Sequence, residues 1–329
     1  MNASLLCLLN LRFLIQDFTC QKYLKFKTFF DMILIKKDIL LTKYLGYKQN
    51  HYFCVMSILK KIFNFYINAS IHVALAVYSF VRITEIYFDL EYNEAVAYFV
   101  FYGTITGYNF VKYFGLAKFH HRSLTQDLKI IQIFSFVCFL LMCYYGFQLS
   151  LNTLFLFGGF GLLTVLYAIP FLSGFQKNLR NISYLKIIVV AVVWAGVTVI
   201  APVFDAGESF EPHRVILQFV QRFLFVCVLI LPFDIRDLSF DAVSLQTIPR
   251  KIGVDKTKKL GYVLLLFTLV LEFLISPNMN HRNVFLGIFF ILLFLLMRAT
   301  AKQSKYYSSF WVELVPVFWS VVLYGIINF

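Results

Sequence analysis

Long apolar runs, separated by short polar stretches, dominate the chain from Met56 to the C-terminus. Most of these runs are close to the length of about 20 residues that a helix needs to cross a membrane. The segments are residues 67–88, 94–116, 129–149, 151–173, 184–204, 214–232, 260–276, 283–298 and 310–328. The pattern therefore predicts an all-α integral membrane protein with nine transmembrane helices.

Residues 1–55 follow a different pattern from the rest of the chain. They mix lysines with aromatic residues, show no clean periodicity and hold no apolar run of spanning length. Two interpretations remain open. Translation begins at Met56 and residues 1–55 are an N-terminal extension that is not translated, or these residues form an amphipathic segment at the membrane surface. Under both interpretations the transmembrane domain comprises residues 56–329.

The composition agrees with a membrane protein and argues against a nucleic-acid-binding protein. Hydrophobic residues make up 60% of the chain and charged residues 14%, with a formal net charge of +13. A positive charge of this size can indicate nucleic acid, but the chain has no polar domain in which basic and aromatic residues alternate. We therefore expect membrane lipid around the protein and no nucleic-acid partner.

Basic residues gather in every second loop between the apolar segments, and this asymmetry predicts the orientation. These loops contain Lys118, Arg122, Lys177, Arg180, Arg236, Arg250, Lys251, Lys256, Lys258, Lys259, Arg298, Lys302 and Lys305. Of the basic residues, the intervening loops hold only Arg214 and Arg282. Because cytoplasmic loops are enriched in Lys and Arg, we expect an inner (cytoplasmic) membrane protein with its N-terminus and even-numbered loops in the cytoplasm. Phe329 would then lie on the opposite side.

An acidic cluster, PFDIRDLSFD at residues 232–241, follows the sixth apolar segment. Asp234, Asp237 and Asp241 are spaced i, i+3, i+7, so on a helix they fall within about 60° of one another. Carboxylate oxygens grouped in this way suit Mg²⁺, which takes one or two carboxylates and leaves its other positions to water and phosphate. The alternative is a solvated loop whose acids pair with the basic residues beside them. Spacing alone does not decide between these readings or name a substrate.

The longer stretch DIRDLSFDAVSLQTIPRKIG resembles the second aspartate motif of the UbiA superfamily of intramembrane prenyltransferases. In that family the aspartates are followed by Thr, a hydrophobic residue and Pro, as Thr247, Ile248 and Pro249 are here. The resemblance covers residues 56–329. It implies a UbiA-like fold, in which nine transmembrane helices surround a central cavity and the active site lies under the cytoplasmic loops.

The family's first motif, Asn-Asp-x-x-Asp at the end of the second helix, is degenerate in this chain. In YNFVKYFGLAKFHHR, Asn109 stands at the Asn position, while Phe110 and Tyr113 replace the two aspartates and Lys112 lies between them. A family Tyr followed by basic residues, between the fourth and fifth helices, matches Tyr167, Lys177 and Arg180. The resemblance thus implies that the substrate is bound by Asn109, Lys112, Tyr113, Tyr167, Lys177 and Arg180.

The resemblance implies Mg²⁺-dependent transfer of a prenyl group from a prenyl diphosphate to a lipophilic acceptor. Asp234, Asp237 and Asp241 would be both the catalytic residues and the metal ligands. Since two carboxylates are missing, we expect one Mg²⁺ site rather than two, with basic groups near Lys112 in place of the second ion. The main alternative is a catalytically degenerate membrane protein that binds an isoprenoid lipid, and a further one is an unrelated transporter. Turnover would indicate the enzyme, co-purified lipid without turnover the binding protein, and flux in vesicles the transporter.

Several other ionisable residues lie in or beside the apolar segments, where such groups are rare. His72 either lines the substrate chamber or bonds to a neighbouring helix. We expect Arg82 and Glu272 to extend toward the membrane surface, and Glu313 to anchor the ninth segment at the interface.

Overall fold

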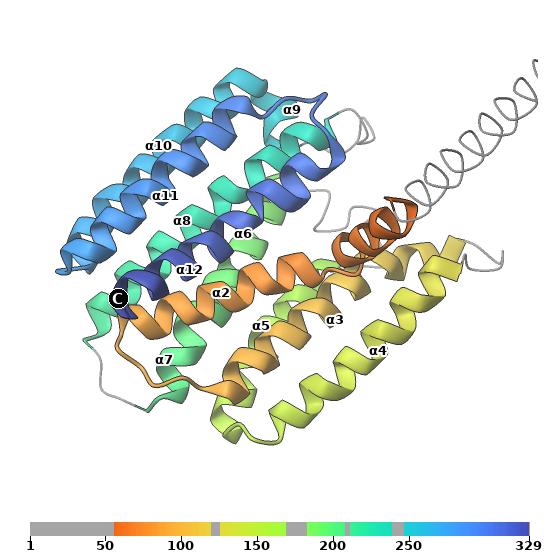
Figure 1. The fold of residues 1–329 in the computed structure, drawn as a ribbon, viewed down its shortest axis with the longest axis horizontal. Helices are drawn as coiled ribbons and strands as arrows, with labels where there is room; N and C mark the ends of the chain where they lie inside the picture. Colours follow the sequence, from red (N-terminus) through yellow and green to blue (C-terminus); the bar gives the residue numbers. More distant parts are fainter. Residues whose placement is uncertain (1–55, 120–125, 169–182, 208–210, 239–246, 329) are drawn as a thin grey trace, which may run out of the picture. The chain divides into compact units, whose positions relative to one another are not determined.

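The computed structural model describes residues 56–119, 126–168, 183–207, 211–238 and 247–328, and all the regular structure that these residues form is helical (Figure 1). The chain divides into two compact units, Met1–Phe63 and Asn64–Phe329. In the first unit, residues 56–63 are helical. The labelled elements of the second unit are α2 (Ile71–Tyr87), α3 (Glu94–Phe119), α4 (Gln126–Gly146), α5 (Leu151–Ala168), α6 (Ser183–Ala195), the π-helix η2 (Gly196–Ile200), α7 (Ala201–Asp205), α8 (Pro212–Asp237), α9 (Ile248–Ile252), α10 (Val254–Ile275), α11 (Met279–Arg298), the π-helix η3 (Tyr307–Val312) and α12 (Leu314–Asn328).

The prediction of an all-α membrane protein is confirmed, whereas the number of membrane crossings stays a prediction. Helices overlap each of the nine apolar segments within the described residues. Five of them are long and apolar enough to span a membrane: Gln126–Gly146, Leu185–Asp205, Pro212–Asp237, Met279–Arg298 and Tyr307–Ile326. A sixth span results if the bent pair Met56–Asn68 and Ile71–Tyr87 is counted as one.

The helices of the second unit pack in a closed order. Going round, α2 contacts α3, α3 contacts α5, α5 contacts α6, α6 contacts α8, and α8 contacts α10. The order continues through α11 to α12, which returns to α2, while α4 packs on α3 outside the ring (Figure 1). The π-helix η2 contacts both α2 and α8, so it bridges two opposite sides of this ring. Helix α8 therefore touches neighbours over much of its length.

An aromatic core joins α2, α8, α11 and α12. Trp319 is almost fully buried, and its ring centroid lies 5.1 Å from that of Phe285, 5.4 Å from that of Phe225 and 6.2 Å from that of Phe80. Edge-to-face and tilted contacts of this kind add to the stabilisation that burial itself provides. This core holds α8 firmly at its middle, and the candidate site lies toward the C-terminal end of the same helix.

Helix α8 continues past Pro232, as the spacing of the aspartates requires. Proline lacks an N–H and cannot donate within the helix, yet α8 runs on to Asp237. Two side chains hold this part of the helix from outside: Gln303 Nε2 and Ser308 Oγ donate to the carbonyl oxygen of Pro232, at 2.7 and 3.1 Å. The last turn of α8 is thereby tied to η3 and to the residues just before it.

Candidate functional site

Two of the three predicted metal ligands lie in the last turn of α8. We call this region, with Asp234, Asp237 and their partners, the aspartate end. Asp234 is fully buried, and Asp237 is partly exposed. The sequence prediction that these residues share a helix is confirmed for this pair. Asp241 lies outside the described residues.

Asp234 forms an ion pair that the sequence analysis did not anticipate. Its Oδ1 accepts a hydrogen bond from Lys186 Nζ of α6 at 2.9 Å, and the Lys186 side chain is 30% exposed. A buried carboxylate requires a compensating partner, because leaving its charge unpaired in a medium of low dielectric constant is costly. Lys186 interrupts the beginning of the apolar segment 184–204. That intramembrane cation was the available signal.

Asp237 also pairs with a cation, in a different setting. Arg236 Nε donates to Asp237 Oδ1 at 2.8 Å, and both side chains are partly exposed. The guanidinium of Arg236 also lies 5.2 Å from the ring centroid of Phe233. Since these partners are neighbours on one helix and reach solvent, the pairing contributes little to stability. A ligand or metal ion can therefore displace it at small cost.

The Thr-Ile-Pro tail of the motif folds into the one-turn helix α9. Thr247 has extended backbone at its start, Pro249 lies in its first turn, and Gly253 ends it with a φ of +85°, which favours glycine. From this helix, Arg250 Nη2 donates to the carbonyl oxygen of Leu238 at 3.2 Å. The tail thus caps the C-terminus of α8 and holds the aspartate end in place.

Three residues of the degenerate first motif, Asn109, Lys112 and Tyr113, bond to a break in the helix that precedes α2. At this break Ser70 adopts the left-handed conformation with a φ of +61°, and carbonyl groups of the preceding turn lose their helical partners. Tyr113 Oη donates to the carbonyl oxygen of Asn68 at 3.0 Å. Lys112 Nζ donates to Ser70 Oγ at 3.0 Å and lies 3.5 Å from the Asn68 oxygen.

Asn109 uses both of its amide N–H groups inside the protein. Its Nδ2 donates to the carbonyl oxygen of Ala69 at 3.0 Å and to Ser135 Oγ of α4 at 2.7 Å. Its Oδ1 accepts from Ser70 Oγ at 2.8 Å. Buried Asn109 therefore pins α3 and α4 to the helix break. The predicted contact of Asn109 with a diphosphate stays a prediction.

The two motifs approach each other through Glu313, at the start of the last apolar segment. This partly buried carboxylate interacts electrostatically with Lys112 of α3 and with Arg236 of α8. Lys112 in turn feels the positive charges of Arg236 and Lys305. One group of charges therefore joins the remnant of the first motif to the aspartate end. Glu313 belongs to this group in addition to any role as an interfacial anchor.

Three other predicted contacts cannot be placed in the same way. Tyr167 lies in the last turn of α5, and its side chain is not described. Lys177 and Arg180 lie outside the described residues. Their assignment as substrate-binding residues stays a prediction.

The donor chemistry of the aspartate end suits magnesium only in part. Carboxylate oxygens are the right ligands, but among the described residues no group of three His, Cys, Asp or Glu side chains could hold a metal ion. Asp237 fits such a role, since its carboxylate is itself partly exposed. Asp234 fits only if Lys186 moves away from it.

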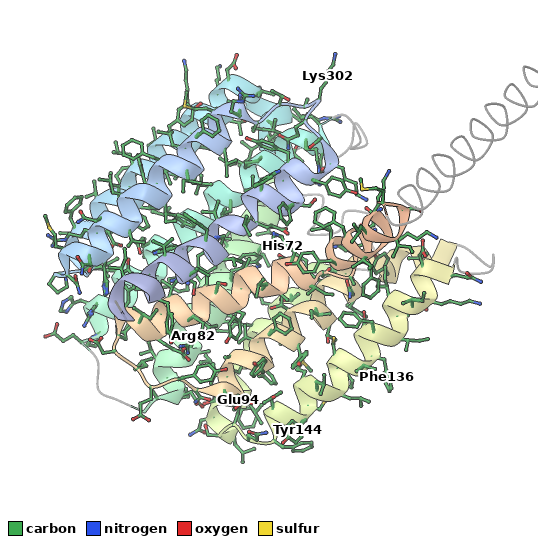
Figure 2. The ribbon with its side chains drawn as sticks, viewed as in Figure 1. His72, Arg82, Glu94, Phe136, Tyr144 and Lys302 are labelled. Atoms are coloured by element: carbon green, nitrogen blue, oxygen red, sulfur yellow. The ribbon has the colours of Figure 1, made fainter. Side chains whose placement is uncertain are left out.

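His72 lies between two partners on the inner side of α2 (Figure 2). A carbonyl oxygen only accepts, so Nε2 carries the proton and donates to the Phe310 oxygen at 2.9 Å, while Nδ1 accepts from Tyr66 Oη at 2.7 Å. Of the two readings of His72, this geometry favours the hydrogen bond to a neighbouring helix. By contrast, Phe136 and Tyr144 project from the outer face of α4, each with 60% of its surface exposed (Figure 2).

A second set of buried polar groups surrounds α8 nearer its N-terminus. We call Arg222, Gln221, Glu272, Tyr87, Thr84 and Thr198 the inner polar cluster. Arg222 Nη1 donates to the carbonyl oxygen of Phe80 at 2.9 Å. Weaker contacts of 3.3 and 3.4 Å join the guanidinium to Thr198 Oγ1 and Thr84 Oγ1. The guanidinium also lies 4.2 Å from the ring centroid of Phe80. Sequence reasoning missed Arg222, although a cation inside an apolar run was visible.

The acidic member of this cluster corrects one expectation. Glu272 is fully buried and does not extend to the membrane surface. Its Oε1 accepts from Tyr87 Oη at 2.8 Å, and its Oε2 accepts from Gln221 Nε2 at 2.7 Å. Arg82 pairs with the neighbouring Glu85 of α2 and is partly exposed, so its extension toward the membrane surface stays a prediction. The error for Glu272 arose because it stands near a segment end, where a long side chain can often reach water.

Taken together, the fold and the site define an all-helical membrane protein with a charged region at one end of a helical ring. No protein-family model matches the chain, and no curated protein sequence matches it.

Solved structures do match. A UbiA homologue from Archaeoglobus fulgidus bound to GPP and Mg²⁺ is 12% identical, with a TM-score of 0.54 over 81% of this chain and 100% of that one. A UbiA homologue from Archaeoglobus fulgidus bound to DMAPP and Mg²⁺ is 11% identical, with a TM-score of 0.52 over 80% of this chain and 99% of that one. A digeranylgeranylglyceryl phosphate synthase is 14% identical, with a TM-score of 0.50 over 82% of this chain and 98% of that one. The chain therefore has the fold of the UbiA superfamily.

Proposed function

We propose that this protein is a membrane prenyltransferase that moves a prenyl group from a prenyl diphosphate to a lipophilic acceptor. The observation that carries the proposal is the single group of charges formed by Lys112, Glu313, Arg236 and the aspartate end. It lies on a fold shared with proteins whose structures hold GPP or DMAPP together with Mg²⁺. A site for a diphosphate needs both carboxylates that can take up Mg²⁺ and cations that face phosphate oxygens.

The chain's own residues divide between these two tasks. Asp237, with Asp241, would hold one Mg²⁺, which when bound neutralises charge on the diphosphate. Lys112 and Arg236 supply fixed positive charge where negative charge grows as the bond between the prenyl carbon and the diphosphate oxygen breaks. Tyr113, Tyr167, Lys177 and Arg180 are the further residues that we propose for substrate contact.

The membrane setting supports a lipophilic acceptor. Exposed apolar side chains cover the outer faces of α4, α10 and α11, and these helices present no broad polar surface there. A site within such a bundle is reached most easily by molecules dissolved in the bilayer. We therefore propose a lipophilic acceptor, with the aspartate end on the cytoplasmic side, where the basic loops predict it.

One observation favours a second candidate, a protein that binds an isoprenoid lipid without turnover. Asn109 donates to the Ala69 carbonyl oxygen at the helix break and to Ser135 Oγ of α4, and both described aspartates are paired with cations. A resting site of this kind has fewer groups ready for a diphosphate and metal than an intact pair of aspartate motifs would supply.

Turnover by the purified protein separates these candidates. The full chain is incubated with labelled prenyl diphosphates, Mg²⁺ and a membrane lipid extract, and labelled lipid products are measured. We expect product, and we expect Asp237→Asn to lower its rate at least about 100-fold, since electrostatic stabilisation of this kind carries several kcal/mol.

The matched control is Asp255→Asn, which removes an exposed aspartate from the first turn of α10. It should leave the rate unchanged. Isoprenoid lipid that co-purifies with the protein, without any labelled product, would replace the enzyme by the binding protein.

A further inference from the structure

The ion pair between Lys186 and Asp234 joins two neighbouring helices of the ring at the aspartate end. Lys186 stands in the first turns of α6, and Asp234 stands in the last turn of α8. Their charged atoms are 2.9 Å apart, which is the length of a charge-assisted hydrogen bond. The carboxylate is fully buried, so it depends on this partner far more than an exposed aspartate would.

The position of the ammonium group bears directly on metal binding. A Mg²⁺ ion bound to a carboxylate oxygen sits at about 2.1 Å. An ammonium group in contact with Oδ1 of the same carboxylate would lie close to that ion and repel it strongly, because the interior screens charge poorly. A divalent ion and Lys186 therefore compete for Asp234. Asp237 differs, since its carboxylate is 28% exposed whereas that of Asp234 is fully buried.

The lysine also has the reach that a substrate contact needs. Its side chain is 30% exposed although its partner is fully buried. An ammonium group carries three donors on a flexible stem and binds phosphate as a point charge. Lys186 thus holds the Asp234 carboxylate while part of its side chain stays accessible from outside the protein.

We propose that Lys186 is a tethered cation that takes the place of a divalent ion at Asp234. The site then binds a metal ion through Asp237 but not through Asp234, and the charge of Lys186 serves the diphosphate in the position of the second ion. The inference rests on the proposed function for its diphosphate part, whereas its metal part concerns only this chain's own residues.

A titration with Mn²⁺ tests the metal part without any substrate. Mn²⁺ prefers the same oxygen ligands as Mg²⁺, and its free concentration can be followed by electron paramagnetic resonance. For the purified full chain in detergent, we expect Asp237→Asn to weaken binding and Asp234→Asn to leave it unchanged. Lys186→Met frees the Asp234 carboxylate, so we expect one additional bound Mn²⁺ per chain or binding about tenfold tighter.

Two further variants make this result specific to the charge of Lys186. Lys186→Met combined with Asp234→Asn should return Mn²⁺ binding to the wild-type value, because the released ligand is then absent. Lys186→Arg keeps a cation and should behave as the wild type does. If Lys186→Met fails to fold, Lys186→Gln removes the charge but keeps an N–H donor for Asp234, and it should show the same gain.

The proposal is overturned if Lys186→Met and Lys186→Gln both fold and bind Mn²⁺ as the wild type does. It is equally overturned if Asp234→Asn weakens wild-type Mn²⁺ binding as much as Asp237→Asn does, since Asp234 would then already be a ligand. Absence of Mn²⁺ binding in every variant also overturns it. Failure of the proposed function shows elsewhere, as lack of turnover of labelled prenyl diphosphate by the wild type.

Discussion

Arg222 and Asp234 are both buried charged residues of α8, about 18 Å apart along a straight helix axis. Arg222 is held by groups that hardly move: the Phe80 carbonyl oxygen, two threonine hydroxyls and an aromatic ring. Asp234 is held by the end of a long, flexible lysine side chain from the next helix. The same helix thus carries one charge held by backbone, hydroxyl and aromatic groups, and another paired with a charged side chain of a neighbouring helix.

This difference separates a structural site from a candidate functional one. In the inner polar cluster, hydroxyl, amide and carbonyl groups from α2, α8, α10 and η2 surround the two charges and hold these elements in register. At the aspartate end the partners are charged side chains: Lys186 pairs with the buried Asp234, whereas the partly exposed pair of Arg236 and Asp237 can exchange with a ligand at modest cost. By the burial of a charged group alone, the inner polar cluster and the aspartate end would both be candidate functional sites. The kind of partner distinguishes them.

Glu272→Leu should have the largest effect on stability. The change leaves Tyr87 Oη and Gln221 Nε2 without their acceptor and removes the negative charge that Arg222 feels. Removing one partner of a buried charge network costs about 3–5 kcal/mol. We expect a marked fall in the midpoint of thermal unfolding in detergent, while the folded fraction still binds Mn²⁺ as the wild type does.

Glu272→Gln is the matched control, because its amide keeps an oxygen that can accept from one of the two donors. Its loss should be clearly smaller. If Glu272→Leu leaves the unfolding midpoint in place, or if it alters Mn²⁺ binding in the folded protein, the division of α8 into two kinds of site does not hold.

Asn109→Ala should have the next largest effect. It removes the donor to the Ala69 carbonyl oxygen and the acceptor for Ser70 Oγ, both at the helix break, and the donor to Ser135 Oγ of α4. Leaving buried polar groups unsatisfied costs about 1–3 kcal/mol, which thermal unfolding would measure. Tyr113→Phe removes the single bond to the Asn68 oxygen and should cost less. A loss of turnover in Asn109→Ala without any loss of stability would instead indicate direct substrate contact.

The sequence predicted the elements better than it predicted the partners within them. The long apolar run before Asp234 predicted a membrane helix, and the interpretation of the aspartates as one stripe assumed that this helix continues past Pro232, which it does. The spacing could not indicate that Lys186, far away in the chain, would pair with Asp234. Such pairings depend on how α6 packs against α8, and local periodicity contains no information about that contact.

The first motif is a second case in which the sequence pattern did not give the partners of the side chains. Its alignment with a family pattern suggested that Asn109 and Lys112 face a substrate. In the structure both bond to the break at Ser70, a residue with an unusual backbone conformation that no local signal indicated. The buried cations and acids inside apolar runs were visible signals. Only the packed helices show which groups satisfy Arg222 and Glu272: water, a rigid partner or a ligand.

Arg250→Met should have the smallest effect on stability and sharpens the comparison most. Arg250 Nη2 caps the Leu238 carbonyl oxygen at the end of α8, a partly exposed contact at the negative end of the helix dipole. Such contacts contribute about 0.3–1 kcal/mol, so the unfolding midpoint should shift little. Turnover of labelled prenyl diphosphate should fall more, since the cap positions the turn that carries Asp237. Lys251→Met, at the exposed neighbouring position, provides the control. Equal turnover by the two variants would mean that the aspartate end keeps its position without this cap. The bonds from Lys186 to Asp234 and from Gln303 and Ser308 to the Pro232 carbonyl oxygen would then be sufficient to hold it.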